Sequence, residues 1–523
     1  MLQQLNSVDS IFIFSDSPRT PMHVGPFFIY DVSTAPNGAV RFKDILNIFK
    51  QRLPLVPVLR RKVMRVPFDL DEPYWVDDPD FDLEQHILHV ALPKPGNRRQ
   101  LNILLARLVS APMNLNRPPW DAYVIEGLDN VEGLPKGSFA MLVRIHHAAI
   151  DGESGHALFK AIHDLSPKGT PVIPKTQYKP AEIPSQMQLL SRTYAHLLGK
   201  PGNIAKVITN AVSARQRINA VKRENPGEQR LVPKTRFSGK VSTNRVLLSF
   251  TLDLETFRTA KNAVEGATVN DAVICMVSGA MRRYLVAKGE LPKESMSSIM
   301  PINVRTEADR GKPGNVVAIT TINMNSNIAD PLRRLEAIHA SAIYTKAYHN
   351  AVGARIMTDV ANSLPAGLTS LGLRVAASSN LIDKSPANTM ITNVPGPTVP
   401  LYLAGAKMVE FQSAGVLLDG VGLFHAIQSY CGRVCVTILA DRRMMPDPEF
   451  YEECLNDAYE ELRAMTGKRS GATASTPKRK TSVAINAKKP IKRSIAPVRA
   501  KIAPTATARK PADRPSTGKR QQR

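Results

Sequence analysis

The chain has 523 residues, 43% of them hydrophobic and 22% charged, which is ordinary for a globular protein with room for more than one domain. Its four cysteines form no CxxC motif and no Cys/His pairing, which argues against a disulfide framework and against a zinc site. The net charge of +24 is uneven, because residues 467–523 contain 17 Lys and Arg and one acid and so carry +16 of it.

The N-terminal residues do not have the pattern of a secretory signal. The first twenty residues carry acids early and lack a basic region before an apolar stretch. No uninterrupted run of about 18 apolar residues follows anywhere in the sequence, so a membrane-spanning helix is not expected. We therefore expect a cytoplasmic protein whose contact with a membrane is peripheral.

The first part of the chain alternates between strand and helix patterns. His23, in the segment Pro21–His23, is expected to be a satisfied loop histidine rather than a catalytic one. Trp120 is one of two tryptophans, and it either fills core volume or borders a site. The predicted elements are strands at Phe27–Val32, Leu59–Pro67, Tyr74–Val76 and Ala122–Ile125, and helices at Phe42–Leu53 and Gln100–Ser110.

An apolar run from Phe139 leads into two adjacent histidines, His146 and His147, followed by Asp151 and Gly152. Successive strand side chains point to opposite faces, so one histidine is expected to be buried and the other to be the functional one. A neutral imidazole is well matched to taking a proton from a hydroxyl near neutral pH. Asp151 is explained by capping the helix that follows it.

Residues 167–242 have the composition of a connector. Proline is frequent between 167 and 184, and Ile183–Arg223 contains seven Lys or Arg and no acid. Apolar residues at helical spacing within that segment predict a pair of basic amphipathic helices. These helices either pack on the body as a connector or lie on an anionic lipid surface.

A second unit of strands and helices is predicted over 243–466. Thr268 and Asp271 have the spacing of a capping box, which leaves Asn270 as the residue that can face a site. Arg305 ends a predicted strand, and Asn393 precedes the turn residues Pro395 and Gly396. From Lys468 onward the sequence lacks aromatic residues and is too poor in apolar groups to fold alone. We expect a disordered basic tail over 467–523, which either binds polyanions non-specifically through charge, with no specific nucleic acid, or serves for solubility or contact with a lipid surface.

Several of these segments resemble one family. His146–Gly152 has the form HHxxxDG, which is similar to the active-site motif of CoA-dependent acyltransferases, and it most resembles bacterial wax ester synthase/acyl-CoA:diacylglycerol acyltransferases. The resemblance covers roughly residues 1–466. It includes the TPMHVG segment, Pro118-Pro119-Trp120 in place of a Pro-Leu-Trp motif, ATVNDAV around Asn270-Asp271, SIMPINVR ending in Arg305, and Asn393-Val394-Pro395.

The resemblance implies an α/β fold of two chloramphenicol-acetyltransferase-like subdomains with mixed sheets and an active site at their interface. The subdomains would span 1–166, which carries HHxxxDG, and 243–466, joined by the connector at 167–242. His147 would be the general base, with His146 beside it, Asp151 in a structural role and Gly152 allowing close backbone approach. The residues implied to bind substrate or support the site are Trp120, Asn270, Asp271, Arg305 and Asn393. Arg305 would meet the phosphates of CoA or pair with Asp151.

The implied reaction moves a fatty acyl group from acyl-CoA to diacylglycerol, to a long-chain alcohol, or to both. Acyl-CoA is a co-substrate, and no cofactor or metal is expected. The protein would work at the inner membrane face or at lipid inclusions. Two alternatives remain: an acyltransferase with a non-lipid acceptor, and an inactive relative that binds lipid surfaces or polyanions. Serine hydrolysis, P-loop, dinucleotide and HExxH zinc chemistry are disfavoured because their motifs are missing from the sequence.

Overall fold

The structure is a computed structural model. It describes residues 3–150, 158–170, 183–198, 232–303, 317–352 and 387–470, together with the positions 219, 223, 367, 370–372 and 385. The chain divides into two compact units, Met1–Thr473 and Ala474–Arg523, and all of the described residues lie in the first. Of the predicted tail, residues 471–523 fall outside the described residues, while residues 467–470 belong to the last helix.

The first large sheet holds the predicted histidine strand near its centre. Its strand order is β12-β13-β2-β7-β6-β5, and β5 and β6 are parallel while the other neighbours are antiparallel. Every residue of β7 is buried, which explains its nearly continuous apolar sequence. The strands are β2 (His23–Asp31), β5 (Ile87–Ala91), β6 (Trp120–Glu126), β7 (Phe139–His146), β12 (Tyr402–Leu403) and β13 (Ala406–Ala414).

The second large sheet is built from the later part of the chain. Its order is β10-β9-β11-β14-β15-β8, and β11 runs parallel to both of its neighbours. The β14–β15 hairpin turns at Cys431 and Gly432, both with positive φ. The strands are β8 (Arg245–Asp253), β9 (Ser297–Asn303), β10 (Val317–Asn323), β11 (Thr389–Pro395), β14 (Leu423–Tyr430) and β15 (Arg433–Asp441).

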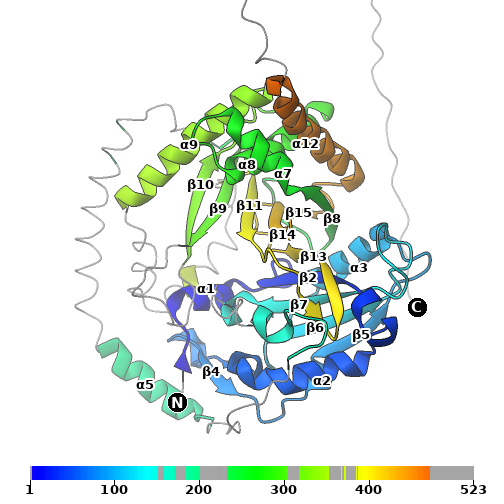
Figure 1. Cartoon of the computed structure of the whole chain (residues 1–523). Helices are drawn as coiled ribbons and strands as arrows, with labels where there is room; N and C mark the ends of the chain where they lie inside the picture. Colours follow the sequence, from blue (N-terminus) through cyan, green and yellow to red (C-terminus); the bar gives the residue numbers. More distant parts are fainter. Residues whose placement is uncertain are drawn as a thin grey trace, which may run out of the picture. The chain divides into compact units, whose positions relative to one another are not determined.

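Four helices pack together against the second sheet (Figure 1). The longest buried one, α8, begins with the predicted capping box, in which Thr268 and Asp271 exchange side-chain and backbone hydrogen bonds. Its side chains are buried on nearly every face because it lies between the sheet and its neighbours α9 and α12. The helices are α7 (Leu254–Ala260), α8 (Val269–Ala287), α9 (Pro331–Val352) and α12 (Pro448–Ser470).

The remaining described elements are a small sheet and several further helices. A three-stranded sheet has the order β1-β4-β3 and comprises β1 (Gln3–Gln4), β3 (Arg61–Met64) and β4 (Tyr74–Asp77). The helices are α1 (Ser7–Ser15), α2 (Phe42–Arg52), α3 (Arg98–Ser110) and α5 (Gln186–Leu198). Short 3₁₀ helices are η1 (Val32–Thr34), η2 (Pro36–Gly38), η3 (Leu53–Leu55), η4 (Pro57–Arg60), η5 (Pro67–Asp69), η6 (Leu83–Gln85), η7 (His147–Ala149) and η9 (Lys261–Ala263).

The two sheets share a hydrophobic core. One cluster of buried residues includes Phe27 of β2, Leu101 of α3, Leu247 of β8 and Ile427 of β14. Helix α3 belongs to the first part of the chain but packs on β8 of the second sheet, while β13 comes from late in the chain and pairs with β2 of the first. The expected α/β fold with mixed sheets is therefore confirmed, with the halves joined by exchanged elements.

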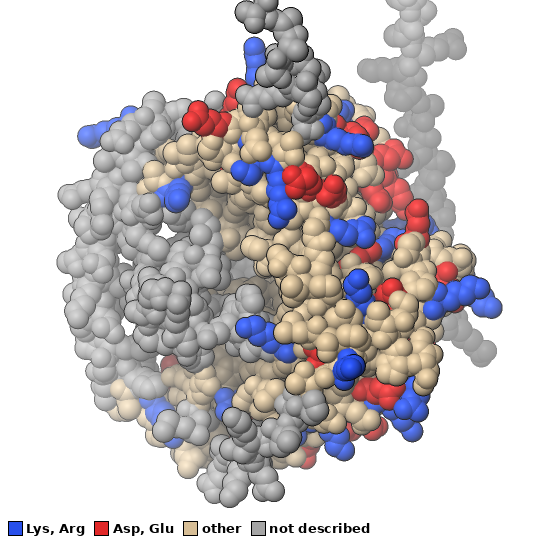
Figure 2. Space-filling view, in the orientation of Figure 1, with Lys and Arg blue, Asp and Glu red and all other residues tan. Residues whose placement is uncertain are grey.

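Charged side chains of both signs are interspersed over the described part of the face in Figure 2. This matches the composition, because the residues before 467 carry only the smaller share of the net charge. No helix among the described residues is long and apolar enough to cross a membrane.

Candidate active site

The two adjacent histidines lie at the point where β7 ends. His146 is the last residue of β7 and is fully buried, while His147 begins η7 and is half-buried. The backbone N–H of His146 donates to Pro119 O at 2.9 Å, and that of His147 donates to Met22 O at 2.8 Å. Strand alternation therefore predicts correctly that one of the two rings is buried.

The environment of His146 fixes the position of its proton. Its Nδ1 accepts a hydrogen bond from the N–H of Ala148 at 3.2 Å. Burial, with repulsion from His147 and His23, lowers the pKa of His146 to about 3. The ring is therefore neutral at pH 7 and carries its proton on Nε2.

That Nε2–H faces Asp16, a residue that the sequence analysis did not select. His146 Nε2 is buried and has no hydrogen-bond partner among the described residues, and it lies 4.0 Å from Asp16 Oδ1. The same carboxylate oxygen accepts the N–H of Met22 at 2.7 Å. Burial raises the pKa of Asp16, while the Met22 hydrogen bond acts in the opposite direction. The only signal in the sequence was an acid at a Ser-Pro turn, which has no catalytic pattern.

The ring of His147 is held against an aromatic side chain. It stacks on Phe12 of α1, with ring centroids 4.1 Å apart and planes 10° apart. Burial lowers the pKa of His147 to about 4, and a hydrogen bond to its own backbone opposes that shift. His147 is therefore neutral at pH 7, the form in which an imidazole accepts a proton.

Three of the predicted site residues, Asp151, Gly152 and Arg305, lie outside the described residues. The structure therefore does not test the capping role of Asp151, the backbone role of Gly152, or the choice between CoA phosphates and Asp151 as the partner of Arg305.

His23 is a buried structural histidine, but it lies in a strand rather than in the expected loop, and its Nδ1 has no hydrogen-bond partner among the described residues. It is the first residue of β2, lies opposite His146 in the strand register, and its Nε2 is 3.0 Å from Val109 O. Burial, with the nearby Arg144 cation, lowers the pKa of His23 to about 3. A neutral ring bonded to a backbone carbonyl stabilises the strand pair beside the catalytic candidate.

Trp120 lies in the core of the first half. Its Nε1–H donates to Leu59 O at 2.7 Å, and its ring stacks on His86 and Phe49. The residue is 2% exposed. The contacts of Trp120 therefore fit the core-filling alternative, and in the strand register it lies opposite Ile145 of β7.

The predicted residues of the second half form a separate pair. Asn393 Nδ2 of β11 donates to Asn270 Oδ1 of α8 at 3.3 Å, so the structure brings these two amides together. Asp271 is occupied by the capping box and by His339, whose Nδ1 is 3.0 Å from Asp271 Oδ2. Capping therefore accounts for Asp271, and Asn270 is the residue joined to the β11 side chain.

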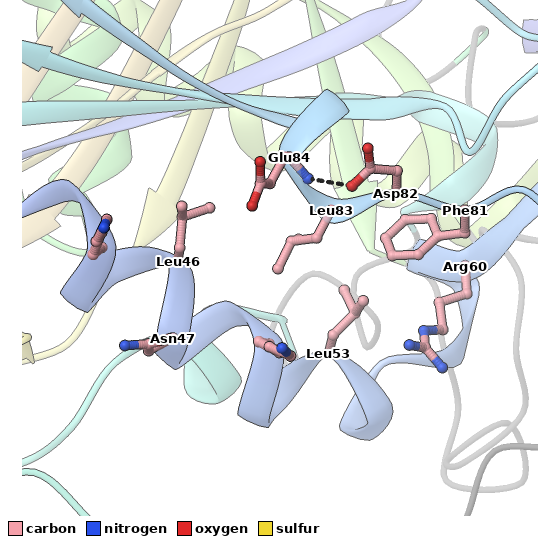
Figure 3. Close-up of a pocket in the computed structure, with 10 residues that line it drawn as sticks. Leu46, Asn47, Leu53, Arg60, Phe81, Asp82, Leu83 and Glu84 are labelled. Carbon is pink, nitrogen blue, oxygen red and sulfur yellow. Dashed lines mark hydrogen bonds between the residues drawn. The ribbon is translucent and has the colours of Figure 1, made fainter.

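A surface cavity of about 550 Å³ lies elsewhere, between α2 and the segment around η6 (Figure 3). Its walls combine cations and carboxylates with apolar side chains, and within it Asp82 accepts the N–H of Glu84 at 3.0 Å. None of its lining residues is one of the predicted site residues. They are Lys43, Leu46, Asn47, Lys50, Leu53, Arg60, Phe81, Asp82, Leu83 and Glu84.

Comparison with known families matches most of the chain. Residues 5–273 match the wax ester synthase/diacylglycerol acyltransferase catalytic domain, and residues 313–463 match the C-terminal domain of the same family. A Mycobacterium tuberculosis protein, named provisionally as a diacylglycerol O-acyltransferase, is 30% identical over 446 residues, covering 84% of this chain and 92% of its own. The O-acyltransferase WSD of Acinetobacter baylyi is 28% identical over 487 residues, covering 89% of this chain and 97% of its own.

Solved structures show the same fold. The wax ester synthase/diacylglycerol acyltransferase from Marinobacter aquaeolei VT8 aligns with a TM-score of 0.60 at 23% identity, covering 89% of this chain and all of that one. The first condensation domain of the CDA synthetase aligns with a TM-score of 0.55 at 12% identity, covering 89% of this chain and 96% of that one. These likenesses confirm the two-subdomain architecture.

Proposed function

The chain belongs to the wax ester synthase/diacylglycerol acyltransferase family, and from this premise we propose that it moves a fatty acyl group from acyl-CoA to diacylglycerol, to a long-chain alcohol, or to both. The observation that carries the proposal is the neutral, half-buried His147 at the end of β7. The relatives named for diacylglycerol and wax ester chemistry support the choice of acceptors.

In the proposed reaction, His147 takes the proton of the acceptor hydroxyl as its oxygen attacks the thioester carbonyl of acyl-CoA. The tetrahedral intermediate collapses by breaking its C–S bond, and the CoA thiolate receives the proton from the His147 imidazolium. The products are an ester and free CoA, and the ring returns to its neutral form. The base activates the acceptor directly, so the reaction needs no covalent enzyme intermediate.

The other residues would prepare this step. The ring of His147 is oriented by stacking on Phe12 and by the hydrogen bond from its backbone to Met22. Asn270 and Asn393, joined across α8 and β11, are proposed to support the wall formed by the second half. Asp151, Gly152 and Arg305 keep the roles that the family resemblance implies for them.

Acyl-CoA is proposed as the donor. A starter condensation domain of rhizomide synthetase, whose structure contains C8-CoA, aligns with this chain at a TM-score of 0.51 and 14% identity. That protein has the same fold, and its ligand supports a CoA thioester as the donor here. No further cofactor enters the proposed chemistry.

We also propose that the protein works on the cytoplasmic face of a membrane or on lipid inclusions. Helix α5 lies in the basic connector and buries Leu189, but it leaves Met187 76% and Tyr194 67% exposed. Phe68 of η5 is 90% exposed. Exposed apolar side chains beside basic residues are typical of contact with an anionic lipid surface. The basic tail would add non-specific attraction to polyanions.

The function is tested by incubating the purified protein with labelled acyl-CoA and a panel of acceptors: diacylglycerol, a long-chain alcohol, a sugar and water. We expect ester formation with the lipid acceptors. His147→Ala should reduce the rate by about 10² to 10⁴-fold, as expected for the loss of a general base. His89→Ala is a matched control, because His89 is a surface histidine of β5 whose ring is 41% exposed.

Each alternative has its own outcome in this assay. A strong preference for the sugar would favour the non-lipid acceptor and contradict the lipid assignment. An absence of transfer to any acceptor by a folded protein would leave only the inactive, surface-binding relative. A rate for His147→Ala equal to that of His89→Ala would remove His147 from the mechanism.

A further inference from the structure

The loop between α1 and β2, residues Asp16–Met22, contacts both histidines of the candidate site. Asp16 accepts the N–H of Met22 and so closes the loop at 2.7 Å. Met22 O in turn accepts the N–H of His147 at 2.8 Å. Asp16 Oδ1 also lies 4.0 Å from the buried Nε2–H of His146. A shift of this loop would therefore move the surroundings of both rings.

The same loop is attached to the second half of the chain by an ion pair. Arg19 donates from both terminal guanidinium nitrogens to the two oxygens of Asp419, at 3.0 and 2.9 Å. Asp419 lies between β13 and β14, on the other half of the molecule. A paired, two-point contact of this kind fixes orientation as well as distance.

Asp419 is itself held in place. Its Oδ1 accepts the N–H of Val241 at 2.9 Å, and the next residue, Gly420, donates its N–H to Gly239 O at 2.9 Å. The loop makes a second contact with the second half, because the guanidinium of Arg245 in β8 donates a hydrogen bond to the carbonyl oxygen of Arg19. The ion pair therefore joins the histidine loop to an anchored segment of the second half.

We propose that Arg19 and Asp419 are positioning residues for the proposed acyl transfer, which hold the Asp16–Met22 loop so that His147 keeps its catalytic geometry, with Asp16 orienting the neighbouring His146. This inference rests on the proposed function of His147. It assigns the second half of the chain a direct part in placing the base, through the ion pair rather than through substrate.

Stability and catalysis should respond differently to the loss of this pair. The Arg19 side chain is 42% exposed and that of Asp419 13%, and partly exposed ion pairs contribute little to global stability. A displaced base is costly, because a misplacement of about 1 Å can reduce a rate roughly 10²-fold. Loosening the loop without removing its other contacts should therefore lower kcat while the protein stays folded.

The test uses Arg19→Gln, Asp419→Asn and the double variant in the full chain. Asp419→Asn keeps an oxygen that can accept the Val241 N–H. We expect kcat to fall about tenfold in each single variant, with KM for acyl-CoA within about twofold, because orientation rather than binding is lost. If both act through one contact, the double variant should be no slower than the slower single variant.

Arg99→Gln provides the matched control. Arg99 of α3 also forms an ion pair with a residue of the second half, Glu449 of α12, but its side chain is 70% exposed and that of Glu449 58%. Its removal should leave kcat unchanged. Equal kcat in Arg19→Gln and Arg99→Gln, or a kcat loss that only follows a lowered melting temperature, would overturn the proposal.

Asp16 is tested by a conservative and a disruptive change. Asp16→Asn keeps an oxygen that can accept the Met22 N–H and keeps a polar group near His146 Nε2, whereas Asp16→Ala removes both. We expect Asp16→Asn to retain most of the wild-type kcat and Asp16→Ala to lose about 10²-fold. Equal losses in the two variants would contradict an orienting role.

A readout independent of activity separates this inference from the proposed function. Hydrogen–deuterium exchange at the His147 amide should accelerate in Arg19→Gln and Asp16→Ala, because its acceptor, Met22 O, belongs to the loosened loop. Unchanged exchange would overturn the positioning role even if the enzyme is active. If the wild type transfers no acyl group, the proposed function fails. Hydrogen–deuterium exchange would still test whether the Arg19–Asp419 ion pair holds the Asp16–Met22 loop.

Discussion

His147 is neutral mainly because its ring is buried at the point where β7 ends. Burial is the main cause of its lowered pKa, and Phe12 covers one face of its ring. Strand alternation predicts that one histidine of the pair is buried, and His146 is, whereas the choice of His147 as the base comes from the family resemblance. Strand alternation could not find Asp16, because the contact with His146 joins a loop to a strand end that are far apart in sequence.

The lowered pKa of His147 predicts the pH at which kcat/KM begins to decline on the acid side. Protonation removes the base, so kcat/KM should stay level as the pH falls from 8 to about 5 and should decline only toward about pH 4. An ordinary histidine would lose half of the activity near 6.5. The measurement is kcat/KM between pH 4.5 and 8 with unfolding monitored at each pH. An inflection near 6.5 in folded protein would contradict it.

At the scale of elements, β13 shows why part of the fold is invisible in the sequence. Its residues alternate cleanly between buried and half-buried, yet two of the buried positions are Glu410 and Gln412. A polarity pattern therefore misses this strand, whereas β7 and the capped helix α8 follow the expected patterns. Glu410 is tolerated because Arg98 and Gln412 both donate to it.

The pairing of Arg98 with Glu410 should matter for stability. Arg98→Ala leaves a carboxylate, 6% exposed, with Gln412 as its remaining side-chain donor among the described residues, so we expect a loss of about 2 to 3 kcal/mol in the free energy of unfolding. Arg99→Ala, beside it on α3, breaks only the exposed pair with Glu449 and should cost less than about 0.5 kcal/mol. Urea unfolding of the two variants compares them directly, and equal costs would show that Glu410 does not need Arg98.

Across the described part of the molecule, several deeply buried histidines have lowered pKa values. His23, His146 and His425 have pKa values of about 3 and His163 of about 4, in each case mainly because of burial. In the unfolded chain these rings protonate near 6.5. The unfolded state therefore binds more protons between those limits, so their stabilising contribution is complete above pH 6.5 and is lost as the pH falls toward 4.

We accordingly expect the urea concentration at the unfolding midpoint to decrease as the pH is lowered from 7.5 to 5.5. At one pH unit below 6.5, each such histidine should reduce the free energy of unfolding by about 1.4 kcal/mol. In His425→Gln one titrating ring is gone, although its bonds to Thr389 and Tyr451 are also affected. The variant should be less stable at pH 7.5 but should lose less on acidification than the wild type. An identical pH dependence in both proteins would exclude His425 from the effect.

The tail is expected to act separately from catalysis. Removal of residues 474–523, the second compact unit, should leave turnover of a soluble short-chain acceptor within about twofold of the full chain. Binding to anionic vesicles should weaken and lose part of its salt dependence, because most of the excess positive charge is removed. A large loss of soluble turnover would show that the tail belongs to the folded enzyme.

The exchange of β13 into the first sheet has a consequence for biosynthesis. Lys407 of β13 pairs with Asp31 of β2, so the strand that carries His23 lacks this neighbour until residues 406–414 have left the ribosome. During that time β2 has one open edge, which is a hazard for aggregation in nascent chains. Asp419, the partner of Arg19, emerges later still. The enzyme should therefore mature only after nearly complete translation, and products that stop before β13 should require chaperones rather than show partial activity.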